Sequence, residues 1–139
     1  MYQTIVLAYD GSEHAQKAAT LAGEEARVHG AKVVIVYAYD PVPEWLGEPL
    51  FEEALARRVT YAQEKVKEAR ERLGEVPAGI EEEILEGPAA EAILNVAKVR
   101  KADLIVMGTR GLGGLAGVLL GSQSQKVVAL SPCPVLLVK

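Results

Sequence analysis

The sequence predicts an α/β protein with an open parallel β-sheet, and three features of its 139 residues lead to this prediction. Short apolar runs alternate along the chain with amphipathic helical segments, which favours parallel strands joined by right-handed crossovers. The length fits one domain, covering residues 1–139. Half of the residues are apolar and only 5% are aromatic, so we expect a core built mainly from Ala, Val, Leu and Ile.

The first strand is predicted at the apolar run 4–9, which the sequence 10–12 closes as a turn. Ser12 can cap the helix that follows, and Gly30 can end that helix in a left-handed conformation. The helix carries a face of small residues that lets it lie close to a sheet: Ala15, Ala18, Ala19, Ala22 and Ala26.

A second buried strand is predicted at residues 32–39, followed by a loop at 40–49 that contains three prolines. Trp45 in this loop is either a lid on a pocket or a packing anchor, and we favour the anchor. Apolar residues at steps of four and three then predict an amphipathic helix whose inner face carries Leu55, Val59, Ala62, Val66, Ala69 and Leu73.

The third strand is predicted at residues 80–86, at an edge of the sheet because it holds too many carboxylates to bury: Glu81, Glu82, Glu83 and Glu86. Pro88 is expected at the first position of the third helix. A fourth strand at 103–108, a fourth helix at 122–130 and a fifth strand at 134–138 complete the pattern.

The net charge of −4 argues against a general nucleic-acid binder. All 19 acidic residues lie at or before Asp103, and the charges that follow are positive: Arg110, Lys126 and Lys139. This asymmetry suits an anionic ligand, although a buried terminal strand beside a sparsely charged loop would produce it too.

Other residue types exclude several kinds of site. Cys133 is the one cysteine, which excludes an intramolecular disulfide and a metal–thiolate cluster, and we interpret it as a small buried apolar group. His14 and His29 have no companion ligands and are interpreted as surface residues. No signal segment and no apolar run of ~18 residues is evident, so we expect a soluble cytoplasmic protein without a membrane partner.

The strongest functional signal is the glycine-rich segment 108–122, which joins a strand end to a helix start. Backbone N–H groups of such a loop, together with a helix N-terminus, form an anion site. The sequence 122–125 has the form of a capping box, and the hydroxyls of Ser122 and Ser124 are expected where phosphate oxygens would lie. The alternative is a flexible connection without a ligand.

Two standard phosphate motifs do not fit this segment. A Walker A loop requires a lysine where Leu120 precedes Gly121 and Ser122. The stretch 111–116 matches the loose dinucleotide fingerprint, but it follows the fourth strand and no acidic residue lies downstream to bind a ribose.

The glycines of this segment resemble the nucleotide-binding pattern of the ATP-binding branch of the universal stress protein family. In that pattern two residues separate the first two glycines, and nine residues separate the second glycine from a Gly-Ser pair. It is matched without a gap by Gly108, Gly111, Gly121 and Ser122. The resemblance covers the whole chain, including residues 5–12 and 132–138. It implies an open five-stranded parallel sheet of order 3-2-1-4-5 with helices on both faces, an adenine nucleotide alpha-hydrolase-like fold.

The resemblance also implies ATP at the ends of strands 1 and 4. Gly108 and Gly111 would lie near the ribose and phosphates, and the backbone of Ala38 would contact the adenine. The phosphates would be held by Gly121, Ser122 and Ser124. The remaining predicted contacts are Ala8, Tyr9, Asp10, Met107, Arg110 and Gln123, and some relatives carry a proline at the position of Ala8.

Asp10 is the carboxylate nearest to the predicted switch point of the sheet. It could bind a ribose hydroxyl or a Mg²⁺ ion held by the phosphates, or it could stabilise the turn before the first helix, and both roles are compatible.

Three functions remain in contention. The first is an ATP-binding regulatory protein of the stress response, the second a weak ATPase or other enzyme that uses adenine nucleotides, and the third a dimeric scaffold that binds no nucleotide. No His, Asp or Glu lies between Thr109 and Ser122 to orient a water, which favours binding over turnover. The uncharged fifth strand predicts a homodimer paired through that edge, as in many relatives.

Overall fold

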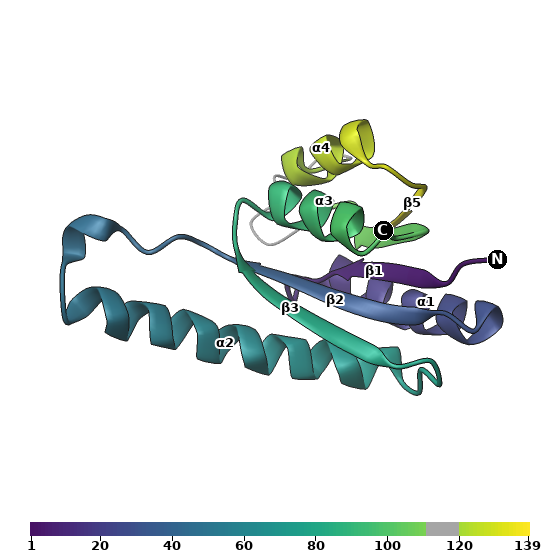
Figure 1. Ribbon diagram of the computed structural model, residues 1–139, viewed down its shortest axis with the longest axis horizontal. Coiled ribbons are helices and arrows are strands. Elements are labelled where there is room, and N and C mark those ends of the chain that lie inside the picture. Colours follow the sequence, from purple (N-terminus) through teal and green to yellow (C-terminus); the bar gives the residue numbers. More distant parts are fainter. Residues whose placement is uncertain (111–119) are drawn as a thin grey trace.

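The chain forms a five-stranded parallel sheet of order β3-β2-β1-β4-β5, in a computed structural model that describes residues 1–110 and 120–139 (Figure 1). The strands are β1 (Thr4–Ala8), β2 (Lys32–Tyr39), β3 (Ile80–Glu86), β4 (Leu104–Gly108) and β5 (Val135–Val138). The helices are α1 (Glu13–His29), α2 (Leu50–Leu73), α3 (Ala89–Val99) and α4 (Ser122–Leu130), with a short 3₁₀ turn, η1 (Glu44–Leu46). The predicted strand order and alternation are confirmed.

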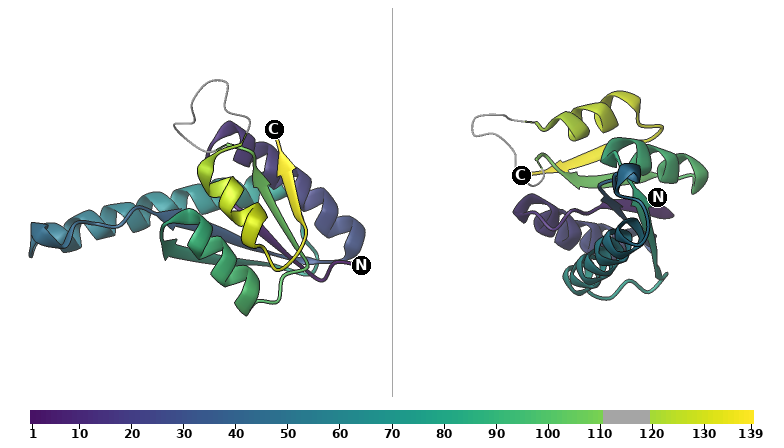
Figure 2. Two further views of the ribbon diagram at one scale, coloured as in Figure 1. Left: turned by 90° about the horizontal axis from the view of Figure 1, so that it is seen from above. Right: turned by 90° about the vertical axis from the view of Figure 1, so that its left-hand side faces the viewer.

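Helices cover both faces of the sheet, as Figures 1 and 2 show. On one face α1 and α2 pack against alternate residues of the central strands, such as Leu7 and Ile35. On the other face α3 and α4 pack against the intervening residues, such as Val6 and Val34. Because both faces of β1, β2 and β4 are covered, these strands carry apolar residues in succession rather than in alternation.

The first helix begins and ends where the sequence predicts. The Ser12 hydroxyl accepts a hydrogen bond from the backbone N–H of Ala15 at 3.2 Å. Gly30 follows the last turn at φ 68°, a left-handed conformation that glycine adopts without steric cost. The predicted small-residue face of α1 is fully buried, so the helix lies close to the sheet.

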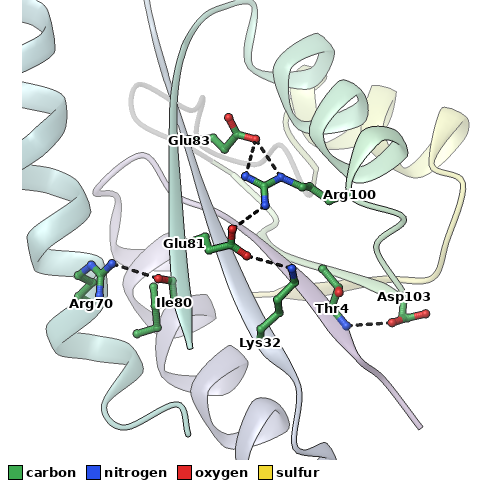
Figure 3. Close-up of polar contacts among 8 residues, drawn as sticks. All are labelled: Thr4, Lys32, Arg70, Ile80, Glu81, Glu83, Arg100 and Asp103. Carbon is green, nitrogen blue, oxygen red and sulfur yellow. Dashed lines mark hydrogen bonds and ion pairs between the residues drawn. The ribbon is translucent and has the colours of Figure 1, made fainter. Parts of the chain in front are cut away.

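The edge position of β3 is confirmed, and ion pairs engage three of its four glutamates, two of which appear in Figure 3. Glu81 accepts from Arg100 at 2.8 Å and lies 3.0 Å from the amine of Lys32, and these contacts hold the pKa of Glu81 below its usual value. Glu83 pairs with the same guanidinium of Arg100, and Glu82 pairs with Arg70 on the opposite face. These charged side chains make the β3 edge unsuited to pairing with another strand.

Helix α2 begins at Leu50, directly after the predicted loop at 40–49. Three local expectations were wrong. Pro88 lies just before α3, in an extended conformation, rather than at its first position. Trp45 is 83% exposed and therefore is not a packing anchor. Cys133 is only partly buried; burial raises the pKa of its thiol, which lies 3.6 Å from the Ser131 hydroxyl.

Figure 1 shows the first half of α2 projecting beyond the carboxyl ends of the strands, together with the segment that leads into it. This half of the helix therefore forms a wall beside the strand ends instead of covering the sheet. Within the described residues, no helix is both long and apolar enough to span a membrane.

Candidate functional site

The carboxyl ends of the parallel strands meet a cavity of about 1020 Å³ among the described residues. Its floor comes from the ends of β1, β2 and β4, and its walls come from α2 on one side and the starts of α3 and α4 on the other. The chain leaves β1 into α1 on one face of the sheet and leaves β4 toward α4 on the opposite face. Such a switch point opens a crevice in which ligands of this fold class bind.

Most of the predicted site residues line this cavity. They are Ala8, Tyr9, Asp10, Ala38, Gly108, Arg110, Gly121, Ser122, Gln123 and Ser124. Met107 is not among the described lining residues, because its side chain packs into the core on the α3 face. Gly111 lies outside the described residues.

Asp10 lines the cavity and also holds the turn that follows β1. Its carboxylate accepts a hydrogen bond from the backbone N–H of Ser12 at 2.9 Å. The turn in which it takes part directs the chain into α1, where Ser12 rather than Asp10 caps the helix. Asp10 therefore stabilises the turn and, at the same time, lines the cavity.

Tyr9 reaches the cavity from the end of β1, while its hydroxyl donates to Glu68 on α2. Burial and the neighbouring carboxylate raise the pKa of Tyr9 far above its ordinary value. The same hydrogen bond, with the Lys65 amine 3.2 Å away, lowers the pKa of Glu68. The phenol stays protonated and ties β1 to α2.

The two ends of the glycine-rich segment are joined by one backbone hydrogen bond and one side-chain hydrogen bond. Gly121 N–H donates to Thr109 O at 2.8 Å, and the Ser124 hydroxyl donates to Gly108 O at 3.0 Å. The hydroxyl of Ser124 is therefore engaged with the strand, unlike the exposed Ser122. Helix α4 begins at the predicted residue, but the capping box does not form, because Gly121 precedes the helix and Ser122 is its first residue.

Gln123 has a structural role that no sequence pattern predicted. Its side-chain oxygen accepts from the backbone N–H of Ala90 at 2.8 Å, so it satisfies a donor in the first turn of α3. Lys126 pairs with Glu91 at 3.0 Å across the same two helices. These contacts hold the starts of α3 and α4 side by side at one wall of the cavity.

The absence of a side chain at Gly108 is explained by packing. A Cβ atom at position 108 would lie 2.6 Å from the Cβ of His14. Only glycine at this position therefore lets α1 approach the end of β4 so closely. His14 is partly buried, and its Nδ1 lies 2.9 Å from the Thr109 hydroxyl. His29 is also partly buried, against Tyr2 and Glu25. The expectation that both histidines are surface residues was wrong.

The wall formed by α2 was missed from the sequence. It presents Arg57, Arg58 and Tyr61 to the cavity. Arg58 donates to the backbone oxygens of Asp40 and Pro41, the latter at 2.7 Å, and thereby fixes α2 to the end of β2. The spacing of 57, 58 and 61 places these residues on one side of the helix, but the sequence alone made them look like ordinary solvated surface.

No group of three or more His, Cys, Asp or Glu side chains able to hold a metal occurs among the residues that the structure describes. Asp10 and Asp40 are the carboxylates among the described lining residues, whereas Arg57, Arg58 and Arg110 are cations. The cavity therefore combines an apolar floor with positive charge, which suits an organic anion.

The chain matches the model of the universal stress protein family over residues 1–139. The universal stress protein of the QAH/OAS sulfhydrylase 3′ region of Thermus aquaticus is 58% identical over 139 residues, with both chains covered completely.

Solved structures with the same fold include complexes with nucleotides. A universal stress protein in complex with cAMP aligns with a TM-score of 0.73 at 31% identity, covering 99% of this chain and 97% of its own. The Archaeoglobus fulgidus universal stress protein in complex with dAMP aligns with a TM-score of 0.66 at 25% identity, covering 99% of this chain and 98% of its own.

Proposed function

This chain belongs to the universal stress protein family, and from that premise we propose that it is an ATP-binding regulatory protein of the stress response. The observation that carries the proposal is the cavity at the ends of β1 and β4, which lies at the switch point of the sheet. Relatives of the same fold were solved with cAMP and with dAMP, so an adenine nucleotide is the ligand class that we infer.

The residues of the cavity fit the two halves of such a ligand. Ala8, Val36 and Ile93 offer an apolar surface for the adenine, next to the backbone of Ala38. We assign the phosphates to the start of α4, where backbone N–H groups at a helix N-terminus favour an anion. Arg110 lines the cavity and would add positive charge.

We assign Mg²⁺ to the phosphates rather than to a protein cage, because the described residues offer no cluster of metal ligands. Asp10 is the carboxylate that would supplement the phosphate oxygens, as hard oxygen donors suit this ion. We propose binding rather than efficient hydrolysis, since the described lining residues include no histidine to act as a general base.

Gly121→Val tests the phosphate assignment. Gly121 has an ordinary extended conformation, φ −65° and ψ 158°, and an added Cβ would lie 3.6 and 3.7 Å from its nearest neighbours among the described residues, Thr109 and Arg110. The fold therefore tolerates a side chain there, at a cost of about 1 kcal/mol for a poor cap. A branched side chain would nevertheless obstruct the approach of phosphate, and one lost charge-assisted hydrogen bond weakens binding by about tenfold or more.

The measurement is calorimetric titration of ATP into the parent and the variant, with thermal melts of both to confirm folding. A folded Gly121→Val protein that binds ATP as tightly as the parent would refute the assignment. The mass and absorbance of any nucleotide that copurifies with the parent would identify the resident form.

A further inference from the structure

Thr109 is the point at which three parts of the molecule are joined. Its backbone N–H donates to Val138 O at 2.9 Å, which ties the end of β4 to the end of β5. Its carbonyl accepts from Gly121 N–H at 2.8 Å, which ties the end of β4 to the residue before α4. Its hydroxyl lies 2.9 Å from Nδ1 of His14, in the first turn of α1.

His14 approaches this junction from the start of α1. It follows the turn that contains Asp10, and its Cβ packs against Gly108 so closely that no other residue fits there. Thr109 is 7% exposed, so its hydroxyl has little access to water and depends on the imidazole for a hydrogen bond. The pair therefore sets the separation between the turn after β1 and the start of the glycine-rich segment.

We propose that His14 and Thr109 are positioning residues for the phosphate-binding part of the site. Neither is among the described residues that line the cavity, so they act through the backbone rather than on the ligand. The pair orients the carbonyl of Thr109, which holds Gly121 N–H and hence the start of α4. This inference rests on the proposed function. It predicts that the pair contributes to the affinity for the phosphates of ATP and not to the affinity for adenosine.

His14→Ala is a suitable test, because alanine keeps the Cβ that packs against Gly108 and removes only the imidazole. Thr109→Val removes the hydroxyl at nearly constant volume. Each variant should bind ATP about three- to tenfold more weakly than the parent, the effect of one lost hydrogen bond, while adenosine affinity stays within about twofold. The double variant should be no weaker than the weaker single variant, because both changes remove the same interaction.

Two further variants separate positioning from a loss of stability. His14→Asn and Thr109→Ser each keep a group able to form the hydrogen bond, and both should restore most of the ATP affinity. His29→Ala is the matched control: it removes an imidazole from the other end of α1, where it contacts Tyr2 and Glu25, and ATP affinity should not change.

Titration calorimetry with adenosine and with ATP, alongside thermal melts, distinguishes the outcomes. Loss of ATP affinity with unchanged adenosine affinity, and recovery in the conservative variants, supports the proposal. Unchanged ATP affinity, equal losses for both ligands, or an equal loss in His29→Ala overturns it. A parent protein that binds neither ligand would overturn the proposed function itself, which is a different result.

Discussion

Asp10 serves two purposes that a single substitution to alanine would confuse. Its carboxylate accepts from Ser12 N–H at 2.9 Å and so supports the turn into α1. The same residue lines the cavity, where its charge would face the phosphates and Mg²⁺. The hydrogen bond requires an oxygen acceptor, whereas the proposed ionic role requires a negative charge, and asparagine keeps the first and removes the second.

Asp10→Asn should weaken Mg²⁺-dependent ATP binding and leave the melting temperature nearly unchanged. Asp10→Ala should show the same loss of binding and, in addition, cost about 1 kcal/mol of stability because the turn loses its acceptor. The measurement is ATP titration with Mg²⁺ and with EDTA, together with thermal melts. Equal ATP affinity for parent and Asp10→Asn in the presence of Mg²⁺ would show that the carboxylate serves only the turn.

At the scale of secondary-structure elements, α2 changes character halfway along its length. Its second half packs against α1 and the sheet through Ala62, Val66, Ala69 and Leu73. Its first half projects past the strand ends and presents Arg57 and Arg58 to the cavity (Figure 1). Arg58 is hydrogen-bonded to backbone carbonyls, whereas Arg57 makes no hydrogen bond or ion pair with any described residue.

Arg57→Gln should therefore reduce ATP affinity by about three- to tenfold, the scale expected when one partly exposed cation near an anion is lost. Adenosine affinity should not change, because only the phosphates carry the charge that Arg57 would attract. Lys67→Gln is the matched control, with the same charge change at an exposed position of α2 that does not line the cavity.

The measurement is titration of ATP and of adenosine into the parent and both variants at two salt concentrations. An ionic contribution of Arg57 to ATP affinity should weaken as the salt concentration increases. A larger effect of Lys67→Gln than of Arg57→Gln would show that general charge, rather than the wall of the cavity, attracts the nucleotide.

At the scale of the whole molecule, the two edges of the sheet differ. Edge strand β3 is covered by ion pairs, whereas edge strand β5 consists of four uncharged apolar residues. The carbonyl of Pro134 accepts from Ile105 of β4 at 3.0 Å, and that of Val138 accepts from Thr109, directly after β4, at 2.9 Å. The alternation along a strand directs the backbone groups of Val135 and Leu137 away from β4, toward the open edge. We propose that a second copy pairs with these groups to form a twofold dimer.

Leu137→Pro should produce a monomer, because proline removes an outward-facing N–H without touching the bonds to β4. Leu137→Ala is the control: it loses the same packing against the core but keeps the N–H, and it should remain a dimer. Sedimentation velocity at micromolar concentration measures both. A parent protein that sediments as a monomer would contradict the proposed interface.

Local patterns predicted most of the fold. The strands at 32–39 and 80–86 and the helix at 122–130 match the structure residue for residue, because apolar periodicity and turn residues act over short distances along the chain. Errors occurred where a distant group changed the local outcome. Ser122 was expected to cap α4, but the backbone of Gly121 is held by Thr109, which places Ser122 inside the helix.

The sequence by itself determined the alternation of strands and helices, the guarded edge at β3 and, through the spacing of Gly108, Gly111, Gly121 and Ser122, the family. Only the tertiary structure decided which polar side chains line the cavity and which hold the elements around it in place. Arg57 faces the cavity because α2 extends past the sheet, and Gln123 supports α3 because two helix starts lie together. His14 contacts Thr109 across 95 residues of sequence. Such contacts depend on the packing of separate elements, and no periodicity or short motif encodes them.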